Sequence, residues 1–438
     1  MNDSQLHPSR REVIGAAAGA MLASAAPALA ELAGGKEPIT IVVIGTGARG
    51  SDLIRALTTI DNVRIVALAD DYPPHLNKAA ALVRGAVKTF ADYRKMIEVA
   101  KPQAAVIAVP LALHYPIASD VLAAGGDVFL EKTMCYSIDD ARKLADQVTR
   151  SKQVFQVGLQ RRANAIYDQA LAMVQAGHIG QISAIKSQWH RNDSWRRPMP
   201  LLKSDPQYAS LDRRLNWRLY RDSSRGLLAE LGSHQMDVAN VLLGRPPARV
   251  FATGGIDYWR DGREVADNVF CIFEYDMPPA ANGGADAKPY TVRVTYSAIC
   301  NNAFEGASEL VMGNKGTLYL TSDKGLLYRE QVPEQIQWAA PSTLPNAAAA
   351  EQNAAVITAG KTLKMSNDPF AHRGKPIEID NEGGDDTRAE LVSFLDHVRR
   401  RDPKTICDAR AGLIDAATVL SAHDALMTGK TVEFPKDI

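Results

Sequence analysis

Carboxylate and imidazole side chains recur at helical spacing in the stretch GLLAELGSHQMDVANVLLG. If residues 227–243 form a helix, Glu230, His234 and Asp237 fall at positions i, i+4 and i+7 and share one face. An imidazole flanked by carboxylates can be oriented and kept basic, as a general base near neutral pH requires. A structural core histidine fits the same spacing. A metal ligand is disfavoured, since neither H-E-x-x-H nor a Cys/His cluster accompanies this histidine.

A lysine follows an apolar run in FLEKTM, where Glu131 and Lys132 would stand at the carboxyl end of a strand. Open α/β sheets bind their ligands beside such strand ends. A partly desolvated lysine there can hold or polarise a substrate hydroxyl, because burial shifts the pKa of lysine readily. A lysine in a surface ion pair is the alternative.

A glycine-rich turn in IVVIGTGARG follows one predicted strand and opens a predicted helix. Its glycines allow a tight turn and let backbone N–H groups approach a pyrophosphate at the helix N-terminus. The next apolar run ends in Asp70 and Asp71, at about the 20-residue distance where a ribose-binding carboxylate is expected. Two acids would repel a 2′-phosphate, which favours NAD over NADP. The candidate cofactor contacts of this motif are Gly45, Thr46, Gly47, Ala48, Arg49, Gly50 and Asp70.

Alternating strands and helices must position these groups. Apolar runs at 39–45, 63–70, 104–110, 127–132 and 154–158 are separated by helix-period segments such as 137–150. This alternation predicts a doubly wound parallel sheet covered on both faces. After residue 180, longer strand patterns linked by turns predict a second domain with a large, open, mainly antiparallel sheet, and helical patterns over 386–399 and 409–427 close the chain. The predicted fold class is α/β.

Tryptophan and arginine side chains gather in QWHRNDSWRRP and NWRLYRDSSRG. Sugars ask for flat apolar faces against their C–H surfaces and planar polar groups around their hydroxyls, so this mixture suits a carbohydrate pocket. Indole and guanidinium groups also serve core packing and interface ion pairs. The candidate substrate contacts are Arg161, Tyr167, His190, Arg191, Asn192, Trp195 and Asp237, and the candidate cofactor contacts from this region are Trp217 and Arg218.

The 438-residue chain is electrically balanced, with 50 Lys and Arg residues against 50 Asp and Glu residues. No global field therefore attracts nucleic acid or an anionic membrane. The four cysteines are widely separated, so zinc-type spacing is absent and no metal is expected. A core of this size does not need a disulfide framework.

Residues 1–30 have the order of an export signal. The pair Arg10 and Arg11 precedes an apolar segment over 13–29, and an A-x-A-like cleavage site ends at Ala30. The segment resembles a twin-arginine signal, an address read by the export machinery rather than an anchor. We therefore expect a periplasmic or secreted mature protein outside the membrane. An uncleaved, anchored form is the alternative, disfavoured because the apolar run is short and rich in Ala and Gly.

The motifs together resemble the Gfo/Idh/MocA family of sugar oxidoreductases. The resemblance rests on IGTGARG, the strand ending at Asp70, AVPLALH, LEKTM and ELGSHQMDV, and it runs across nearly the whole mature chain. It implies a Rossmann domain over 36–160 that binds NAD(P), with Pro110, His114 and Glu131 among its cofactor contacts. It also implies a substrate and oligomerisation domain over 161–438, whose last helix can pack back on the Rossmann domain. A homo-oligomer, dimer or tetramer, is expected.

Two family motifs carry the implied catalytic roles. The E-K-P motif corresponds to Glu131-Lys132-Thr133, and the D-x-G-x-H motif corresponds to Glu230, Gly232 and His234. The resemblance implies Lys132 and His234 as the catalytic pair, with Glu230 in the supporting acidic position. Thr133 stands where proline is usual, and Glu230 adds a methylene where placement is critical. These departures leave the specific reaction open.

Three classes of function follow from these residues. In the first, His234 removes a proton from a sugar or glycoside hydroxyl, Lys132 stabilises the developing alkoxide, and hydride passes to tightly bound nicotinamide. In the second, the same groups run a redox-neutral glycoside hydrolysis through a transient keto group, as in the NAD-dependent glycosidases of glycoside hydrolase family 109. The third is a sugar- or nucleotide-binding protein without turnover. An exported enzyme cannot draw on fresh NAD, so we expect the cofactor to be exported with the folded chain.

Overall fold

The structure, a computed structural model, describes residues 37–279, 287–330, 376–379 and 384–438. The candidate export signal, residues 1–30, lies outside the described residues. No helix within these ranges is long and apolar enough to cross a bilayer. Nor does any cluster of His, Cys, Asp and Glu side chains among the described residues have the size to hold a metal ion. All four cysteines are buried and free.

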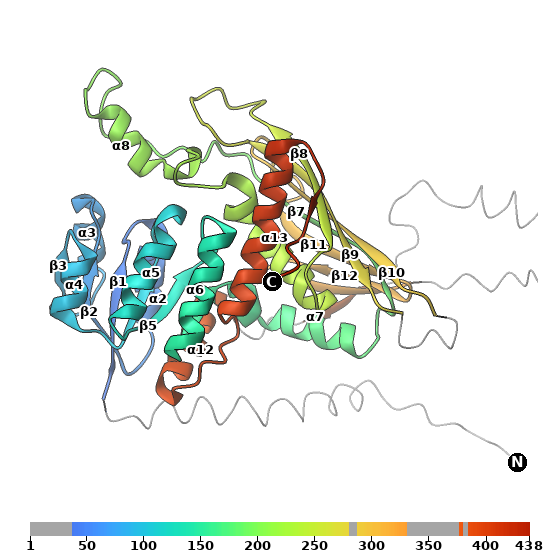
Figure 1. The fold of residues 1–438 in the computed structure, drawn as a ribbon, viewed down its shortest axis with the longest axis horizontal. Helices are drawn as coiled ribbons and strands as arrows, with labels where there is room; N and C mark the ends of the chain where they lie inside the picture. Colours follow the sequence, from blue (N-terminus) through green and yellow to red (C-terminus); the bar gives the residue numbers. More distant parts are fainter. Residues whose placement is uncertain (1–36, 280–286, 331–375, 380–383) are drawn as a thin grey trace, which may run out of the picture.

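Six parallel strands form the sheet of the N-terminal domain, in the order β3-β2-β1-β4-β5-β6 (Figure 1). The strands are β1 Ile39–Ile44, β2 Val63–Ala69, β3 Lys88–Phe90, β4 Ala104–Ile107, β5 Asp127–Glu131 and β6 Phe155–Gly158. The central strands read as near-continuous apolar runs because both of their faces are covered. The strand order reverses between β1 and β4, which opens a crevice at their carboxyl ends.

Helices cover both faces of this sheet. Those that pack on one face are α2 Ala48–Leu57, α3 Pro73–Ala80 and α12 Asp386–Arg400. Those on the other are α4 Tyr93–Ala100, α5 His114–Ala123, α6 Ile138–Ser151 and α13 Ala409–Thr428. Short polar side chains begin the long helices: Ser137, Asp385 and Asp408 accept backbone N–H bonds at the N-termini of α6, α12 and α13.

Nine strands form the second sheet, in the order β14-β13-β12-β11-β7-β10-β9-β8-β15. The strands are β7 Ile182–His190, β8 Arg249–Gly255, β9 Asn268–Met277, β10 Tyr290–Ile299, β11 Ala307–Gly313, β12 Gly316–Leu320, β13 Gly325–Arg329, β14 Ile377–Ile379 and β15 Val432–Glu433. Among the described strands, β7 and β10 pair in parallel and the other neighbours pair antiparallel. The predicted fold class, with one parallel sheet and one mainly antiparallel open sheet, is confirmed.

Among the described residues, helices pack on one face of the second sheet. α7 (Ala165–Gln175), α9 (Ser233–Leu243) and the C-terminal half of α13 pack on that face. α13 therefore contributes to the cores of both domains, and Figure 1 shows it running between them. The opposite face leaves Phe251, Phe270 and Ile272 43 to 48% exposed. A further helix, α8 (Tyr208–Leu215), projects over the Rossmann domain (Figure 1).

Candidate active site

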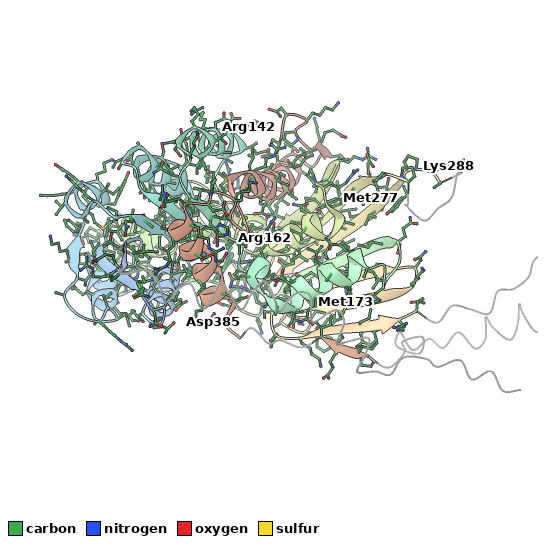
Figure 2. All side chains as sticks on the ribbon, turned by 90° about the horizontal axis from the view of Figure 1, so that it is seen from below. Arg142, Arg162, Met173, Met277, Lys288 and Asp385 are labelled. Carbon is green, nitrogen blue, oxygen red and sulfur yellow. The ribbon has the colours of Figure 1, made fainter. Side chains whose placement is uncertain are left out.

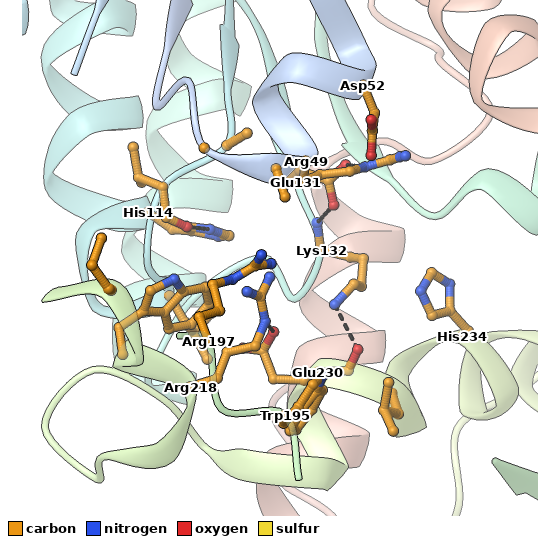
Figure 3. Close-up of a pocket in the computed structure, with 18 of the residues that line it drawn as sticks. Arg49, Asp52, His114, Glu131, Lys132, Trp195, Arg197, Arg218, Glu230 and His234 are labelled. Carbon is orange, nitrogen blue, oxygen red and sulfur yellow. Dashed lines mark hydrogen bonds and ion pairs between the residues drawn. The ribbon is translucent and has the colours of Figure 1, made fainter. Parts of the chain in front are cut away.

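The catalytic candidates line one cavity of about 390 Å³ where the two domains meet (Figure 3). The Rossmann domain contributes the glycine loop after β1 and Lys132 after β5. The second domain contributes His234 in the first turn of α9 and Arg191 in the segment after β7. Because the carboxyl ends of parallel strands meet at one edge of a sheet, motifs far apart in the sequence converge here.

The glycine loop leaves room for a ligand at the start of α2. Gly45 has a φ of +84°, and a Cβ there would lie 2.3 Å from the carbonyl oxygen of Ala108. A Cβ on Gly47, in contrast, would find its nearest neighbour at 3.7 Å, in the ring of His75. The helix begins at Ala48 without a side-chain cap. Its first N–H groups are therefore available to a negatively charged ligand.

Asp70 is held in place at the end of β2. Its Oδ2 accepts hydrogen bonds from the backbone nitrogen of Thr46 at 2.7 Å and from the Thr46 hydroxyl at 3.0 Å. The carboxylate lines a second cavity of about 710 Å³, shared with Gly45, Pro110 and Trp217. Asp70 thus has the position expected of a ribose-binding acid beside the glycine loop.

Arg49 is committed to an ion-pair network although it lines the catalytic cavity. Its guanidinium contacts Glu131 at 2.5 Å and Glu390 of α12 at 2.9 Å. A third bond, of 3.0 Å, joins it to the hydroxyl of Thr387. The side chain of Arg49 therefore links helix α12 to the glycine loop and to β5.

Lys132 is bound to the segment that carries the candidate base. Its Nζ donates to the main-chain oxygen of Glu230 at 2.8 Å, as Figure 3 shows. The next residue, Thr133, follows a cis peptide bond and donates through Oγ1 to the oxygen of Ala229 at 2.7 Å. Burial lowers the pKa of Lys132 from its ordinary value, against the opposing effect of Glu230 and Glu131.

The ring of His114 contacts the main chain just after β5. Its Nδ1 lies 2.8 Å from the oxygen of Thr133, and its Nε2 lies 3.1 Å from the oxygen of Val109. Burial lowers the pKa of His114, so the ring is neutral near neutral pH and donates one of these bonds. Although it lines the cavity, His114 mainly joins two loop backbones.

His234 is a buried, neutral imidazole. Its Nδ1 is buried and has no hydrogen-bond partner within the described ranges, and its ring lies 5.5 Å from the Trp189 ring, centroid to centroid. Burial lowers the pKa of His234 well below its ordinary value, and the positive charges of Lys132 and Arg161 act in the same direction. A neutral imidazole can accept a proton from a hydroxyl placed in this cavity.

The prediction that carboxylates flank this imidazole is wrong. Glu230 pairs with Arg218 at 2.9 Å, and Asp237 forms a two-oxygen pair with Arg162 at 2.7 to 3.1 Å. The predicted continuous helix is also interrupted, because residues Leu228–Gly232 form a π-helical turn before α9 begins. A π turn holds more residues than an α turn, so the i, i+4 relation no longer stacks Glu230 on His234.

Both parts of the chain match models of one protein family. Residues 39–159 match the NAD-binding Rossmann fold of an oxidoreductase family, and residues 172–434 match the C-terminal alpha/beta domain of that family. The chain belongs to the Gfo/Idh/MocA oxidoreductase family. The first domain is accordingly an NAD(P)-binding Rossmann domain, and the family assignment made from the motifs is confirmed.

Sequence relatives within the Gfo/Idh/MocA family are distant. The chain is 29% identical over 141 residues to an inositol 2-dehydrogenase of Pseudomonas fluorescens, covering 32% of this chain and 42% of the relative. It is 23% identical over 212 residues to the uncharacterized oxidoreductase YrbE of Bacillus subtilis, covering 48% and 56%. The chain thus spans about half the length of the curated relatives it matches.

Solved structures of similar fold cover nearly the whole chain. One is a levoglucosan dehydrogenase in complex with NADH and levoglucosan, with a TM-score of 0.65, 16% identity, and coverage of 91% of this chain and 100% of that one. Another is the WlbA dehydrogenase of Bordetella pertussis with NADH and UDP-GlcNAcA, with a TM-score of 0.65, 18% identity, and coverage of 91% and 99%. At this identity the likeness extends to the fold.

In this Gfo/Idh/MocA chain, the predicted substrate contacts separate into two groups. Arg191 and Trp195 line the catalytic cavity, as do the predicted cofactor contacts Trp217 and Arg218. The others lie elsewhere: Arg161 and Tyr167 are buried against Glu309, His190 contacts Ser297 and Glu305, Asn192 is exposed and bridged to Asn301, and Asp237 is buried against Arg162. The residues of this second group do not line the catalytic cavity, and ion pairs and packing hold their side chains; their contact with substrate stays a prediction.

Several cavity residues escaped the sequence analysis. His75 and Arg214 line both cavities, and Arg197 and Gln160 line the catalytic one. Arg197 follows Arg196 in the segment already singled out, but only the structure distinguishes their surroundings. Arg196 forms ion pairs with Asp212 and Asp261. No sequence signal marks His75 or Arg214. His75 lies on α3 beside the glycine loop, whereas the place of Arg214 depends on how α8 meets the Rossmann domain.

Proposed function

We propose that this protein is an NAD-dependent oxidoreductase that acts on a hydroxyl group of a sugar or glycoside, with hydride transfer to a tightly bound nicotinamide. The observation that carries the proposal is the convergence of Lys132, His234 and the glycine loop on one cavity. Membership of the Gfo/Idh/MocA oxidoreductase family supports it. The reaction class, hydroxyl to carbonyl, follows from what the two side chains can do.

His234 serves as the base and Lys132 holds the reacting oxygen. The neutral His234 ring accepts the hydroxyl proton, while the Lys132 ammonium donates a hydrogen bond to the oxygen as negative charge develops there. One N–H of Lys132 is bound to the oxygen of Glu230, which aims the ammonium and leaves its other donors for substrate. When bound, NAD supplies the hydride acceptor at its nicotinamide ring.

The chain fits NAD at the glycine loop. The open space at Gly47 and the uncapped start of α2 suit a pyrophosphate, and Asp70 suits a ribose hydroxyl. We infer a preference for NAD over NADP, because Asp70 and Asp71 would repel a 2′-phosphate. Asp70→Asn should narrow the ratio of NADPH to NADH dissociation constants, measured by fluorescence titration. Asp61→Asn, an exposed acid at the other end of β2, is the control; an unchanged ratio in Asp70→Asn would contradict the inference.

Residues of the second domain help to line the second cavity, and this supports tight binding of the cofactor. Arg213, Arg214 and Trp217 line that cavity together with Asp71, and Arg214 lies 3.6 Å from Asp71. The cofactor would therefore be enclosed by parts of both domains. This agrees with the proposal that the twin-arginine machinery exports the folded protein, with NAD inside, to the periplasm or the medium.

The redox-neutral glycosidase remains chemically compatible with Lys132 and His234, but the family match does not support it. A sugar- or nucleotide-binding protein without turnover would leave the catalytic pair without a role. Aryl glycosides supplied without added nucleotide separate these classes. Phenol release without net NADH would establish the glycosidase, whereas turnover only with NAD or a second carbonyl substrate supports the oxidoreductase.

The deciding experiment uses mature protein purified from the periplasm. Denaturation should release a nicotinamide dinucleotide identifiable by mass, and an empty protein that needs millimolar NAD would contradict tight binding. His234→Ala should abolish turnover on the sugars that the protein binds while retaining the dinucleotide. Near-normal activity in His234→Ala would show that another group is the base.

We also propose a homo-oligomer, dimer or tetramer, formed through the open face of the second sheet. Exposed Phe251, Phe270 and Ile272 support this, because contiguous apolar patches commonly mark interfaces. Light scattering should give a multiple of the chain mass for the wild type and a smaller species for Ile272→Lys. The control is Val99→Lys on α4, an exposed apolar residue of the Rossmann domain. A monomeric wild type would refute the proposal.

A further inference from the structure

The catalytic cavity carries an excess of positive charge. Its charged lining residues are the cations Arg49, Lys132, Arg191, Arg197, Arg214 and Arg218 and the carboxylates Asp52, Glu131 and Glu230. Two of the carboxylates are engaged by arginines within the cavity, Glu131 by Arg49 and Glu230 by Arg218. The third, Asp52, pairs with Arg55 outside it.

Arg191 and Arg197 are the arginines of this cavity that have no acidic partner. Within the described part of the chain, neither side chain forms an ion pair or a hydrogen bond. Their neighbour Asp193 is exposed, and its Oδ1 accepts from the backbone nitrogen of Trp195 instead. Burial lowers the pKa of each guanidinium and the nearby Arg218 adds repulsion, while the charge of Asp193 acts in the opposite direction without forming an ion pair. Both nevertheless stay charged near neutral pH.

Other arginines in the same region are paired, so the lack of partners is selective. Arg196 contacts Asp212 at 2.8 Å and Asp261 at 3.1 Å. Arg213, on α8, contacts two acids at the surface. A charge taken out of water is costly unless it is compensated. Arg191 therefore holds an unmatched charge at a place where its Nε atom is already buried.

Arg191 belongs to the catalytic end of the cavity rather than to the cofactor end. Its guanidinium lies 5.6 Å from the ring centroid of Trp189 and 5.0 Å from that of Trp195. The Trp189 ring also lies 5.5 Å from the His234 ring, centroid to centroid. Neither Arg191 nor Arg197 lines the second cavity, where Asp70 and the start of the glycine loop lie. Arg191 and the proposed base thus share Trp189 as a neighbour within one cavity.

We propose that the substrate is a sugar bearing an anionic group, whose negative charge is bound by Arg191 with support from Arg197. This inference rests on the proposed function and narrows its substrate class to acidic sugars. The planar guanidinium suits a carboxylate or a phosphate by paired hydrogen bonds, while Trp189 and Trp195 supply flat faces for the ring. The Lys132 and His234 pair then meets a hydroxyl of the same sugar.

Binding is the readout, because it does not depend on which hydroxyl reacts. Holoenzyme is titrated, by quenching of its tryptophan fluorescence, with glucuronate and galacturonate, with glucose and galactose as matched neutral sugars, and with glucose 6-phosphate as the phosphate arm. The sugar acids should bind at least about tenfold more tightly than their neutral partners, the usual worth of one charge-assisted pair. Tight binding of the phosphate ester alone would identify phosphate as the anion.

Three variants identify the charge that distinguishes acidic from neutral sugars. Arg191→Gln should remove the preference for the acidic sugar, and Arg197→Gln should reduce it, with NADH affinity and thermal midpoint unchanged. Arg64→Gln, an exposed arginine on β2, should behave as wild type. Three results would each overturn the inference: equal binding of neutral and acidic sugars, a preference for the acidic sugar that survives in Arg191→Gln, or no binding of either the sugar acids or the phosphate ester.

The failure of this inference is distinguishable from failure of the proposed function. A holoenzyme that carries NAD and oxidises neutral sugars would refute the anionic substrate alone. A protein that binds acidic sugars but carries no dinucleotide would refute the oxidoreductase. Loss of NADH affinity in Arg191→Gln would assign this arginine to the cofactor and overturn the inference.

Discussion

Lys132 donates a hydrogen bond from its Nζ to the main-chain oxygen of Glu230, across 2.8 Å. The bond joins the end of β5 to the π-helical turn before α9, and the hydroxyl of Thr133 makes a parallel bond to Ala229. Main-chain acceptors thereby hold together the two segments that carry the proposed catalytic pair, Lys132 and His234. Because these acceptors are main-chain atoms, the bonds do not depend on which side chain stands at residue 230. The carboxylate of Glu230 binds Arg218 instead.

The imidazole of His234 should stay neutral at pH values where an ordinary histidine is half protonated, about 6.5. Burial and the Lys132 charge both disfavour its protonated form. The proposed base is therefore available down to a pH below that value, and it is lost as pH falls through the lowered pKa. Imidazole NMR, assigned with His234→Gln, measures this. Lys132→Met should raise the pKa of His234, and an unchanged value would show that Lys132 is not close enough to act.

Two glycine substitutions should separate folding from cofactor binding. Gly45→Ala forces a Cβ onto the oxygen of Ala108 at a positive φ, so it should cost about 1–3 kcal/mol or more in the free energy of unfolding. Gly47→Ala meets only the ring of His75 at 3.7 Å, so its stability should change by less than about 1 kcal/mol.

The same pair is then compared by NADH titration. The methyl group of Gly47→Ala occupies the space that a pyrophosphate needs, so the dissociation constant should rise at least about tenfold, the equivalent of one lost hydrogen bond or more. Wild-type affinity in Gly47→Ala would contradict the placement of the pyrophosphate at this loop.

The Asp237–Arg162 pair should matter for stability rather than for the base. Arg162, labelled in Figure 2, has a side chain 22% exposed, and its partner Asp237 is 1% exposed. Asp237→Asn leaves a guanidinium without its counter-charge, which should cost about 3 kcal/mol in urea unfolding. Asp139→Asn, which breaks an exposed pair with Arg142, should cost at most about 0.5 kcal/mol.

The same variant tests the sequence interpretation. If Asp237 oriented His234, Asp237→Asn would shift the His234 imidazole titration. We expect that titration to be unchanged, because Asp237 directs both of its oxygens to Arg162.

The buried His423 of α13 should make the protein less stable in acid. Burial, followed by repulsion from Arg225, lowers its pKa to about 4. Between the unfolded value of about 6.5 and the folded value, the unfolded chain binds a proton that the folded chain does not, so stability falls as pH falls. At about pH 5 this loss should be roughly 2 kcal/mol relative to neutral pH. His423→Gln should show a smaller loss in urea titrations at the two pH values; an equal loss would assign the effect to other groups.

The fold could be predicted because each strand and helix has a local sequence pattern that indicates it. The Rossmann strands are apolar runs bounded by turns, and a strand buried on both faces has no other composition available. The helices of residues 386–400 and 409–428 were anticipated within one residue at each end, since acidic caps and apolar periodicity mark them. The sequence singled out Gly45, Lys132 and His234 because each stands at a motif whose chemistry requires that residue type; the structure brings Lys132 and His234 to one cavity, and their roles stay predictions.

The surroundings of those residues were not predictable from spacing. An ideal helix over 227–243 would place Glu230 and Asp237 beside His234. The π turn changes the spacing, and the two carboxylates form ion pairs with Arg218 and Arg162 instead. Partners of this kind come from other elements, and helical periodicity records only neighbours along one helix.

By itself the sequence determined the two sheets, the glycine cradle, and the identities of the lysine and histidine, because apolar period and turn chemistry act over a few residues. Tertiary structure alone decided which arginines keep a free charge. Arg196 and Arg197 are neighbours in the chain, yet one is neutralised by Asp212 and Asp261 while the other faces the cavity. Charge pairing depends on distance through space, and distance in space is set only once the two domains have packed around α13.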